Sequence, residues 1–331
     1  MKLKKEWKVV IMLIFILSII LTLLVFKTDI FKKKEEKVIP KTPEEVLLDQ
    51  GIKLVSKEDF VKKTEKLLSK GYKPEEINQI YEYMSDKNLN AILENDYTDL
   101  SSFYPISNFN FAKIERYKAY QTLENLDMKE AVTRVNLNLD IPPYSEIIEI
   151  KDPASLTVCV SKYRHLPSTY VPEDLENIPG YSLQLRKVAM DDYLKLIEAS
   201  KLDGLSLIPY STYRSYDYQV KLYNYYLERD PVNVVDTYSA RPGHSEHQTG
   251  LTIDIRSRSL TDNLTDSDYN WMMNNSYKYG FIIRYPKNSQ NITGYIEEPW
   301  HIRYVGVDVA TKIHDLNISL DEYNDLYLTE Y

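Results

Sequence analysis

The chain has 331 residues, enough for one substantial domain and a smaller one, and its 43% hydrophobic and 27% charged residues are ordinary globular proportions. Its net charge of −8 divides into +6 over residues 1–41 and −14 over the rest, and an acidic main body argues against nucleic acid as the partner. The single cysteine, Cys159, excludes an intramolecular disulfide framework and a cysteine-rich zinc site, and its apolar neighbours predict a small buried side chain.

The first predicted element is an apolar helix near the N-terminus. Residues 9–26 are apolar apart from Ser18 and Thr22, and this run of 18 positions is close to the shortest that spans a bilayer. Lysines lie on both sides of the run, and no small-residue cleavage site follows it. We therefore predict an uncleaved signal anchor with a transmembrane helix in residues 1–27, a single-pass location in the cell membrane and an extracellular main body. A cleaved signal peptide is the alternative.

A linker and a small helical module are predicted next. Residues 28–45 are rich in Lys and Glu and contain two prolines, which is typical of a solvated linker. Residues 46–150 then show helical patterns: Ser56 is the predicted cap of one helix, Pro74 opens a second, and residues 112–126 form a third. The module shows no catalytic group of residues. Plain packing is its simplest role, and a spacer or binding role is the alternative.

The remaining domain, residues 151–331, mixes helices with strands. Apolar periodicity predicts one helix over residues 182–200 and another from Asp217. Short apolar runs predict three strands, at residues 205–210, 251–255 and 300–305. Because most strands follow the first helices and the turns are too short for repeated crossovers, we expect an α+β fold with a mostly antiparallel sheet flanked by helices.

Histidines beside acidic residues indicate a metal site in this domain. After Gly250, strand alternation places Asp254 on the face opposite the apolar residues, and His247 lies on the approach to that strand. His301, in a second segment that begins with Glu298, can supply a third ligand. Two imidazoles and one carboxylate, with a fourth position left to water, describe a catalytic zinc site rather than a structural one.

Such a site needs a base and a cation beside the metal. Glu298 is the candidate base for the attacking water, and Arg214 is the candidate that stabilises the developing oxyanion. His244 has no second acidic partner at useful spacing, and we interpret it, with His165 and His314, as structural. A serine mechanism is disfavoured because no Ser-x-x-Lys element stands at a helix start beside the other groups that it needs.

Several ordered motifs resemble a known family. They are Tyr213-Arg-Ser, Arg241-Pro-Gly-His-Ser-Glu-His-Gln-Thr-Gly, Ile253-Asp, Gly280-Phe-Ile-Ile-Arg-Tyr-Pro, Thr293-Gly-Tyr and Glu298-Pro-Trp-His-Ile-Arg-Tyr-Val-Gly. Over about residues 155–310 the chain resembles the VanY-type D-alanyl-D-alanine carboxypeptidases. These are zinc peptidases related to the VanX dipeptidases, and they share their fold with the hedgehog signalling domain.

The resemblance implies roles for eight residues and a substrate. The implied zinc ligands are His247, Asp254 and His301, the base is Glu298, and Arg214 stabilises the carbonyl oxygen or the substrate carboxylate. Three further residues are implied near the terminal carboxylate of the substrate: Ser245, Gln219 and Tyr285. The expected substrates are peptidoglycan stem peptides that end in D-alanine.

Two other functions stay open at this point. One is an L,D-carboxypeptidase that acts on tetrapeptides with the same metal site. The other is a zinc-bound but non-catalytic wall-binding module, as in the hedgehog-type use of the fold. Glu298 and Arg214 count against that module, because binding alone needs neither residue.

Overall fold

The computed structural model describes residues 3–30, 40–95, 100, 102–103, 105–258 and 264–328, and in the first helix it places only the side chains of residues 7 and 9–24. The chain divides into two compact units, Met1–Lys62 and Lys63–Tyr331. The predicted divisions after residues 27, 45 and 150 stay predictions.

The first unit contains α1 (Leu3–Ile30) and α2 (Pro43–Asp49). A capping box starts α2: the Thr42 hydroxyl accepts a hydrogen bond from the Glu45 N–H, and the Glu45 carboxylate accepts one from the Thr42 N–H. The helix predicted over residues 9–26 forms as part of α1. Within the described part of the chain no helix combines the length and the apolarity needed to cross a membrane, which differs from the transmembrane prediction. That prediction depended on an apolar run at the lower limit of length.

Short helices follow, as predicted for this part of the chain. They are α3 (Phe60–Ser69), α4 (Pro74–Tyr83), α5 (Asp86–Glu94), η1 (Phe111–Lys113), α6 (Ile114–Glu124) and α7 (Met128–Asn136). Pro74 occupies the first turn of α4, as predicted. The predicted cap at Ser56 is wrong, because Asp59 has a φ of 55° in the left-handed region and the helix begins only after it.

Strands and helices alternate in the rest of the second unit. The strands are β1 (Ile148–Glu149), β2 (Arg164–His165), β3 (Leu175–Asn177), β4 (Gln184–Arg186), β5 (Leu207–Ser211), β6 (Thr252–Ser257), β7 (Phe281–Tyr285) and β8 (Glu298–Tyr304). The α-helices are α8 (Lys187–Leu202), α9 (Tyr216–Leu227), α10 (Val232–Tyr238), α11 (Asp266–Asn275), α12 (Gln290–Thr293), α13 (Val307–Leu316) and α14 (Leu320–Tyr327), and the 3₁₀ turns are η2 (Glu246–Thr249) and η3 (Ser276–Tyr279).

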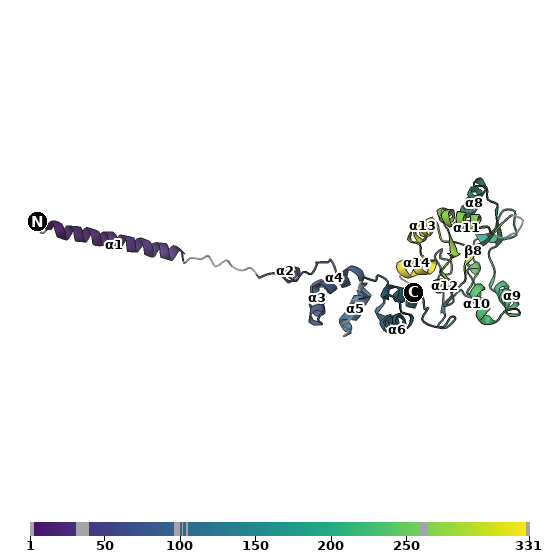
Figure 1. Cartoon of the computed structure of the whole chain (residues 1–331), viewed down its shortest axis with the longest axis horizontal. Coiled ribbons are helices and arrows are strands. Elements are labelled where there is room, and N and C mark those ends of the chain that lie inside the picture. Colours follow the sequence, from purple (N-terminus) through teal and green to yellow (C-terminus); the bar gives the residue numbers. More distant parts are fainter. Residues whose placement is uncertain are drawn as a thin grey trace. The chain divides into compact units, whose positions relative to one another are not determined.

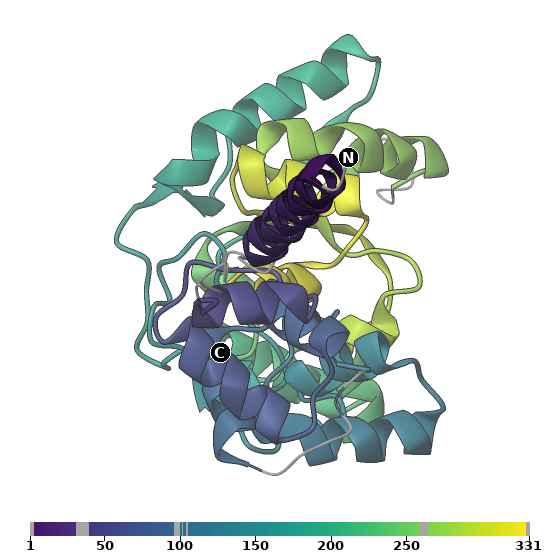
Figure 2. The same cartoon turned by 90° about the vertical axis from the view of Figure 1, so that its left-hand side faces the viewer.

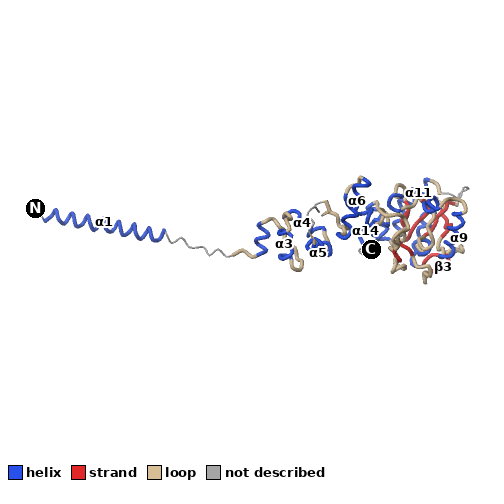
Figure 3. The backbone as a smooth tube through the Cα atoms, turned by 90° about the horizontal axis from the view of Figure 1, so that it is seen from below, coloured by secondary structure: helices blue, strands red, loops and turns tan. Residues whose placement is uncertain are grey.

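The main sheet has the strand order β5-β6-β8-β7, and all its neighbouring strands are antiparallel. Figure 3 draws the strands in red and the helices around them in blue. This confirms the α+β fold with a mostly antiparallel sheet. The pairs outside the main sheet are β3 with β4, which is antiparallel, and β1 with β2, which is parallel. The helix predicted over residues 182–200 begins later, at Lys187, because residues 184–186 pair with β3 instead.

One face of the main sheet carries a hydrophobic core. Apolar residues of all four strands, such as Ile253, Ile283 and Ile302, are buried there together with Tyr193 of α8 and Met272 of α11. The two helices α8 and α11 lie side by side in both views of the ribbon (Figures 1 and 2). With this face closed by apolar packing, the other face of the sheet is left for polar side chains.

Candidate active site

The register of two neighbouring strands brings two of the predicted ligands together. Asp254 of β6 is paired directly with His301 of β8. Paired residues in antiparallel strands point to the same face, while Ile253 and Ile302 point into the core. Both ligand side chains therefore lie on the polar face, where Asp254 is 6% and His301 is 4% exposed.

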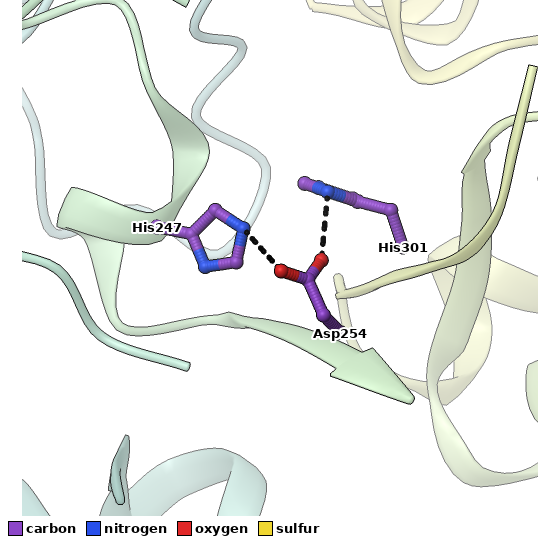
Figure 4. A group of neighbouring side chains, drawn as sticks. All are labelled: His247, Asp254 and His301. Carbon is purple, nitrogen blue, oxygen red and sulfur yellow. Dashed lines mark ion pairs between the residues drawn. The ribbon is translucent and has the colours of Figure 1, made fainter. Parts of the chain in front are cut away.

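The third ligand, His247, comes from the 3₁₀ turn η2 that precedes β6. Gly250 ends this turn with a φ of 66°, and a Cβ there would lie 2.8 Å from Cδ2 of Leu175. Only glycine fits both conditions. The resulting tight turn places Nε2 of His247 3.3 Å from Oδ2 of Asp254, and Nδ1 of His301 lies 3.4 Å from Oδ1 of the same carboxylate (Figure 4).

The three side chains fit a metal ion. One ligand atom from each of the three lies within 4.8 Å of the others. Nδ1 of His247 donates a hydrogen bond to the Thr212 carbonyl at 2.6 Å, which leaves the Nε2 lone pair directed to the site. Oδ1 of Asp254 is buried and accepts no hydrogen bond from the described residues. Burial, aided by Arg214, lowers the pKa of His247 to about 4 and keeps its ring neutral, as a metal ligand requires. The donor set is that of a catalytic zinc site.

Glu298, the predicted base, lies beside this set. It begins β8, is 8% exposed, and its Oε2 is 3.3 Å from Nδ1 of His301, the ring atom that faces Asp254. A carboxylate at that position can reach a water molecule on the metal without itself being one of the three ligands.

Arg214 also lies at the site, but it is oriented by a ligand. Its Nη2 forms an ion pair with Oδ2 of Asp254 at 2.7 Å, and its Nε donates to Oγ of Ser211 at 2.9 Å. Its backbone N–H donates to the carbonyl oxygen of His247 at 3.2 Å. The arginine is thus fixed against the metal ligands from two directions.

A cavity of about 470 Å³ brings all eight predicted residues together. Ser245, Gln219 and Tyr285 line it together with the three ligands, Glu298 and Arg214. Nε2 of Gln219 donates to the Ala240 carbonyl at 2.7 Å, while its buried Oε1 accepts no hydrogen bond from the described residues. The ring of Tyr285 lies with its centroid 5.0 Å from that of His301.

The sequence interpretation missed a buried ionic cluster behind the ligands. Glu246 forms ion pairs with Arg284 at 2.7 Å and with Arg303 at 3.0 Å, and all three side chains are at most 1% exposed. Although burial opposes the charge, the two guanidinium groups hold the pKa of Glu246 below its usual range. A signal was present at Arg284, which interrupts an otherwise apolar strand, where a charged side chain needs a buried partner.

The cysteine is buried, as predicted, and the other histidines contact groups outside the metal set. Nδ1 of His244 lies 2.7 Å from the Ser161 carbonyl, and Nδ1 of His165 lies 3.0 Å from the Leu166 carbonyl. His314 stacks on Tyr277 with ring centroids 3.7 Å apart. Cys159 is buried, and burial raises its pKa well above the usual range, which excludes a reactive thiolate.

Known proteins are similar to this chain over about half of its length. A family model described as VanY, D-alanyl-D-alanine carboxypeptidase, matches residues 182–307. The putative carboxypeptidase YodJ of Bacillus subtilis (strain 168) is 39% identical over 198 residues, 56% of this chain and 72% of YodJ. The bifunctional D-Ala-D-Ala dipeptidase and D-Ala-D-Ala carboxypeptidase VanXYC of Enterococcus gallinarum is 38% identical over 181 residues, 52% of this chain and 94% of VanXYC. The solved structure of the LdcB LD-carboxypeptidase is 39% identical, with a TM-score of 0.50, and the match covers 54% of this chain and 90% of that chain.

The matched region and the site coincide. Residues 182–307 include every residue that the sequence predicted for the site, and they also include the buried cluster around Glu246. The identity and the coverage of YodJ, together with the metal-binding set, lead to one conclusion. The chain belongs to the VanY family of D-alanyl-D-alanine carboxypeptidases, zinc enzymes that cleave peptidoglycan peptides.

Proposed function

We propose that this protein is a D,D-carboxypeptidase that hydrolyses the terminal D-alanine from peptidoglycan stem peptides. The observation that carries the proposal is the carboxylate of Glu298, 3.3 Å from the metal-facing nitrogen of His301 inside the cavity. A wall-binding module would need no acid–base group at that place. Hydrolysis therefore accounts for the site better than binding alone.

The residues of the chain supply most of the proposed mechanism. When bound, zinc lowers the pKa of the attacking water and polarises the scissile carbonyl. The Glu298 carboxylate takes a proton from that water and passes it to the leaving amine of D-alanine. The charge of Arg214, held in place by its ion pair with Asp254, stabilises the oxygen on which negative charge develops.

Three cavity residues are proposed to hold the end of the peptide. The Ser245 hydroxyl and the Gln219 amide line the cavity, and either group can donate a hydrogen bond to a terminal carboxylate. The buried ring of Tyr285 packs against His301 and limits the space around the terminal methyl group. These contacts select a small terminal residue with a free carboxylate.

An L,D-carboxypeptidase activity on tetrapeptides is the second candidate. The observation in its favour is the match to LdcB, named as an LD-carboxypeptidase, at 39% identity over 90% of that chain. Both activities use the same metal set and the same base, so they differ only in contacts to the penultimate residue of the peptide. Mass spectrometry after incubation of the purified full-length chain with tetra- and pentapeptides separates them. Loss of one alanine from the pentapeptide supports the first proposal, and loss from the tetrapeptide supports the second.

We also propose that the enzyme acts outside the cell and is held at the cell membrane by its N-terminal segment. The support is the apolar run of residues 9–26 and the extracellular position of peptidoglycan. Cell fractionation tests this location: the full-length protein should sediment with membranes, and protease added outside intact cells should degrade its main body. A shortened form in the culture medium would contradict the proposal.

A further inference from the structure

A buried carboxylate lies directly behind the metal ligand His301. Oε2 of Glu246 is 3.6 Å from Nε2 of His301, on the side of the ring away from Asp254. Both side chains are nearly inaccessible, with 1% of the Glu246 side chain and 6% of the His301 side chain exposed. Glu246 also immediately precedes the ligand His247 in the chain, so it is positioned by the same short turn.

These two atoms share an unusual feature. Among the described residues, neither Oε2 of Glu246 nor Nε2 of His301 has a hydrogen-bond partner, although both atoms are buried. A buried polar atom without a partner costs about 1–3 kcal/mol, so such pairs are rarely left unsatisfied. The two atoms face each other at a distance only slightly longer than a hydrogen bond. A small rotation of the imidazole ring would join them.

Metal binding requires the arrangement that this rotation would give. His301 offers Nδ1 to the metal, so its proton must be on Nε2, the nitrogen that faces Glu246. A carboxylate that accepts this proton in a hydrogen bond fixes the tautomer and the ring orientation and makes the ligand more basic. The carboxylate is itself held on the opposite side by Arg284 and Arg303, which occupy Oε1 and leave Oε2 for the histidine.

We propose that Glu246 is a positioning residue of the metal site: its Oε2 accepts a hydrogen bond from Nε2–H of His301 and holds that ligand in the metal-binding tautomer. The inference concerns metal affinity and extends the proposed zinc-dependent function. The rival explanation is that Glu246 only neutralises two buried arginines and has no effect on His301.

A matched pair of variants separates the two explanations. Asp321 of α14 also forms an ion pair with Arg284, at 2.6 Å, and it is 4% exposed. It accepts a hydrogen bond from Cys159 and is not one of the three metal ligands. Glu246→Gln and Asp321→Asn thus remove one negative charge each from the same buried cluster. Glu246→Asp keeps the charge but shortens the side chain by one methylene, so it withdraws the carboxylate from His301.

The experiment measures zinc affinity of the purified full-length variants by competition with a chromophoric chelator at fixed pH. Glu246→Gln and Glu246→Asp should weaken zinc binding by roughly 10–100-fold, whereas Asp321→Asn should leave it nearly unchanged. Absorption spectra of the cobalt-substituted proteins give a second measure, and the ligand-field bands should shift in the Glu246 variants alone. If Glu246→Gln does not fold, Glu246→Asp, which keeps the charge, decides the test.

Two results would overturn the inference. One is parent-like zinc affinity in folded Glu246→Asp, and the other is an equal loss of affinity in Asp321→Asn. Failure of the proposed function is a separate outcome, because it would appear as a zinc-loaded parent protein that releases no alanine from any stem peptide. The affinity measurements do not depend on that activity.

Discussion

Replacing Glu298 by Gln tests the proposed base with little change in shape. Among the described residues that line the cavity, the carboxylates are Glu246, Asp254 and Glu298. Glu246 is bound by two buried arginines and Asp254 is a metal ligand, so neither can take over the proton transfer. Glu298→Gln should therefore lower kcat by roughly 10²–10⁴-fold, the usual contribution of a positioned acid–base group. This corresponds to about 2.7–5.4 kcal/mol of activation free energy.

Zinc content and substrate binding should change far less in this variant. The three ligand side chains remain, so elemental analysis should still find about one zinc per chain. Glu297→Gln is the matched control, because it removes the neighbouring, exposed carboxylate by the same chemical change. The assay is the initial rate of D-alanine release from a pentapeptide. A zinc-loaded Glu298→Gln protein that releases D-alanine at nearly the parent rate would refute the role given to Glu298.

Three further predictions concern the metal, the turn and a partly buried acid. Asp254→Ala should lose most of its zinc in elemental analysis, because two imidazoles alone bind the ion weakly. Gly250→Ala should lower the free energy of unfolding in urea by at least about 1 kcal/mol, since φ is 66° and a Cβ would lie 2.8 Å from Leu175. Burial raises the pKa of Asp325 from 3.8 to about 7, so the folded protein keeps a proton that the unfolded chain releases, and stability falls as the pH rises through this window. Asp325→Asn should abolish that fall. The Tm of the variant should exceed that of the parent by more at pH above 7 than near pH 4. An equal gain in Tm at the two pH values would contradict the argument.

The metal set could be predicted because each ligand lies in a local pattern. Strand alternation alone puts Asp254 on the polar face, and Gly250 marks the turn that carries His247. The pairing of Asp254 with His301 was not visible in the sequence, but the donor types restricted the choice to few histidines. The ligands could therefore be predicted from residue types and local strand and turn patterns. The sheet register determines only how Asp254 and His301 meet.

The buried cluster could not be predicted in the same way. Glu246 lies in a short turn, and its partners Arg284 and Arg303 follow much later in the chain on two different strands. Their ion pairs depend on the order of β7 and β8 in the sheet, which periodicity does not determine. The late start of α8 has a similar cause, since residues 184–186 pair with β3 rather than extend the helix. Tertiary pairing overrides local preference at both places.

An irregular pairing of β8 accompanies the position of the proposed base, Glu298, beside the ligand His301 on the same strand. In a regular strand Glu298 and His301, three residues apart, would point to opposite faces of the sheet. The pairing with β7 is regular at Ile283 opposite Ile302 but then shifts, so that Tyr285 lies opposite Glu298. Two steps along β7 correspond to four along β8, so strict alternation does not hold over this stretch, which includes a proline at position 299, and Glu298 lies beside His301. Glu298 therefore lies at a break in the sheet pairing, while the ligands Asp254 and His301 are paired in its regular part.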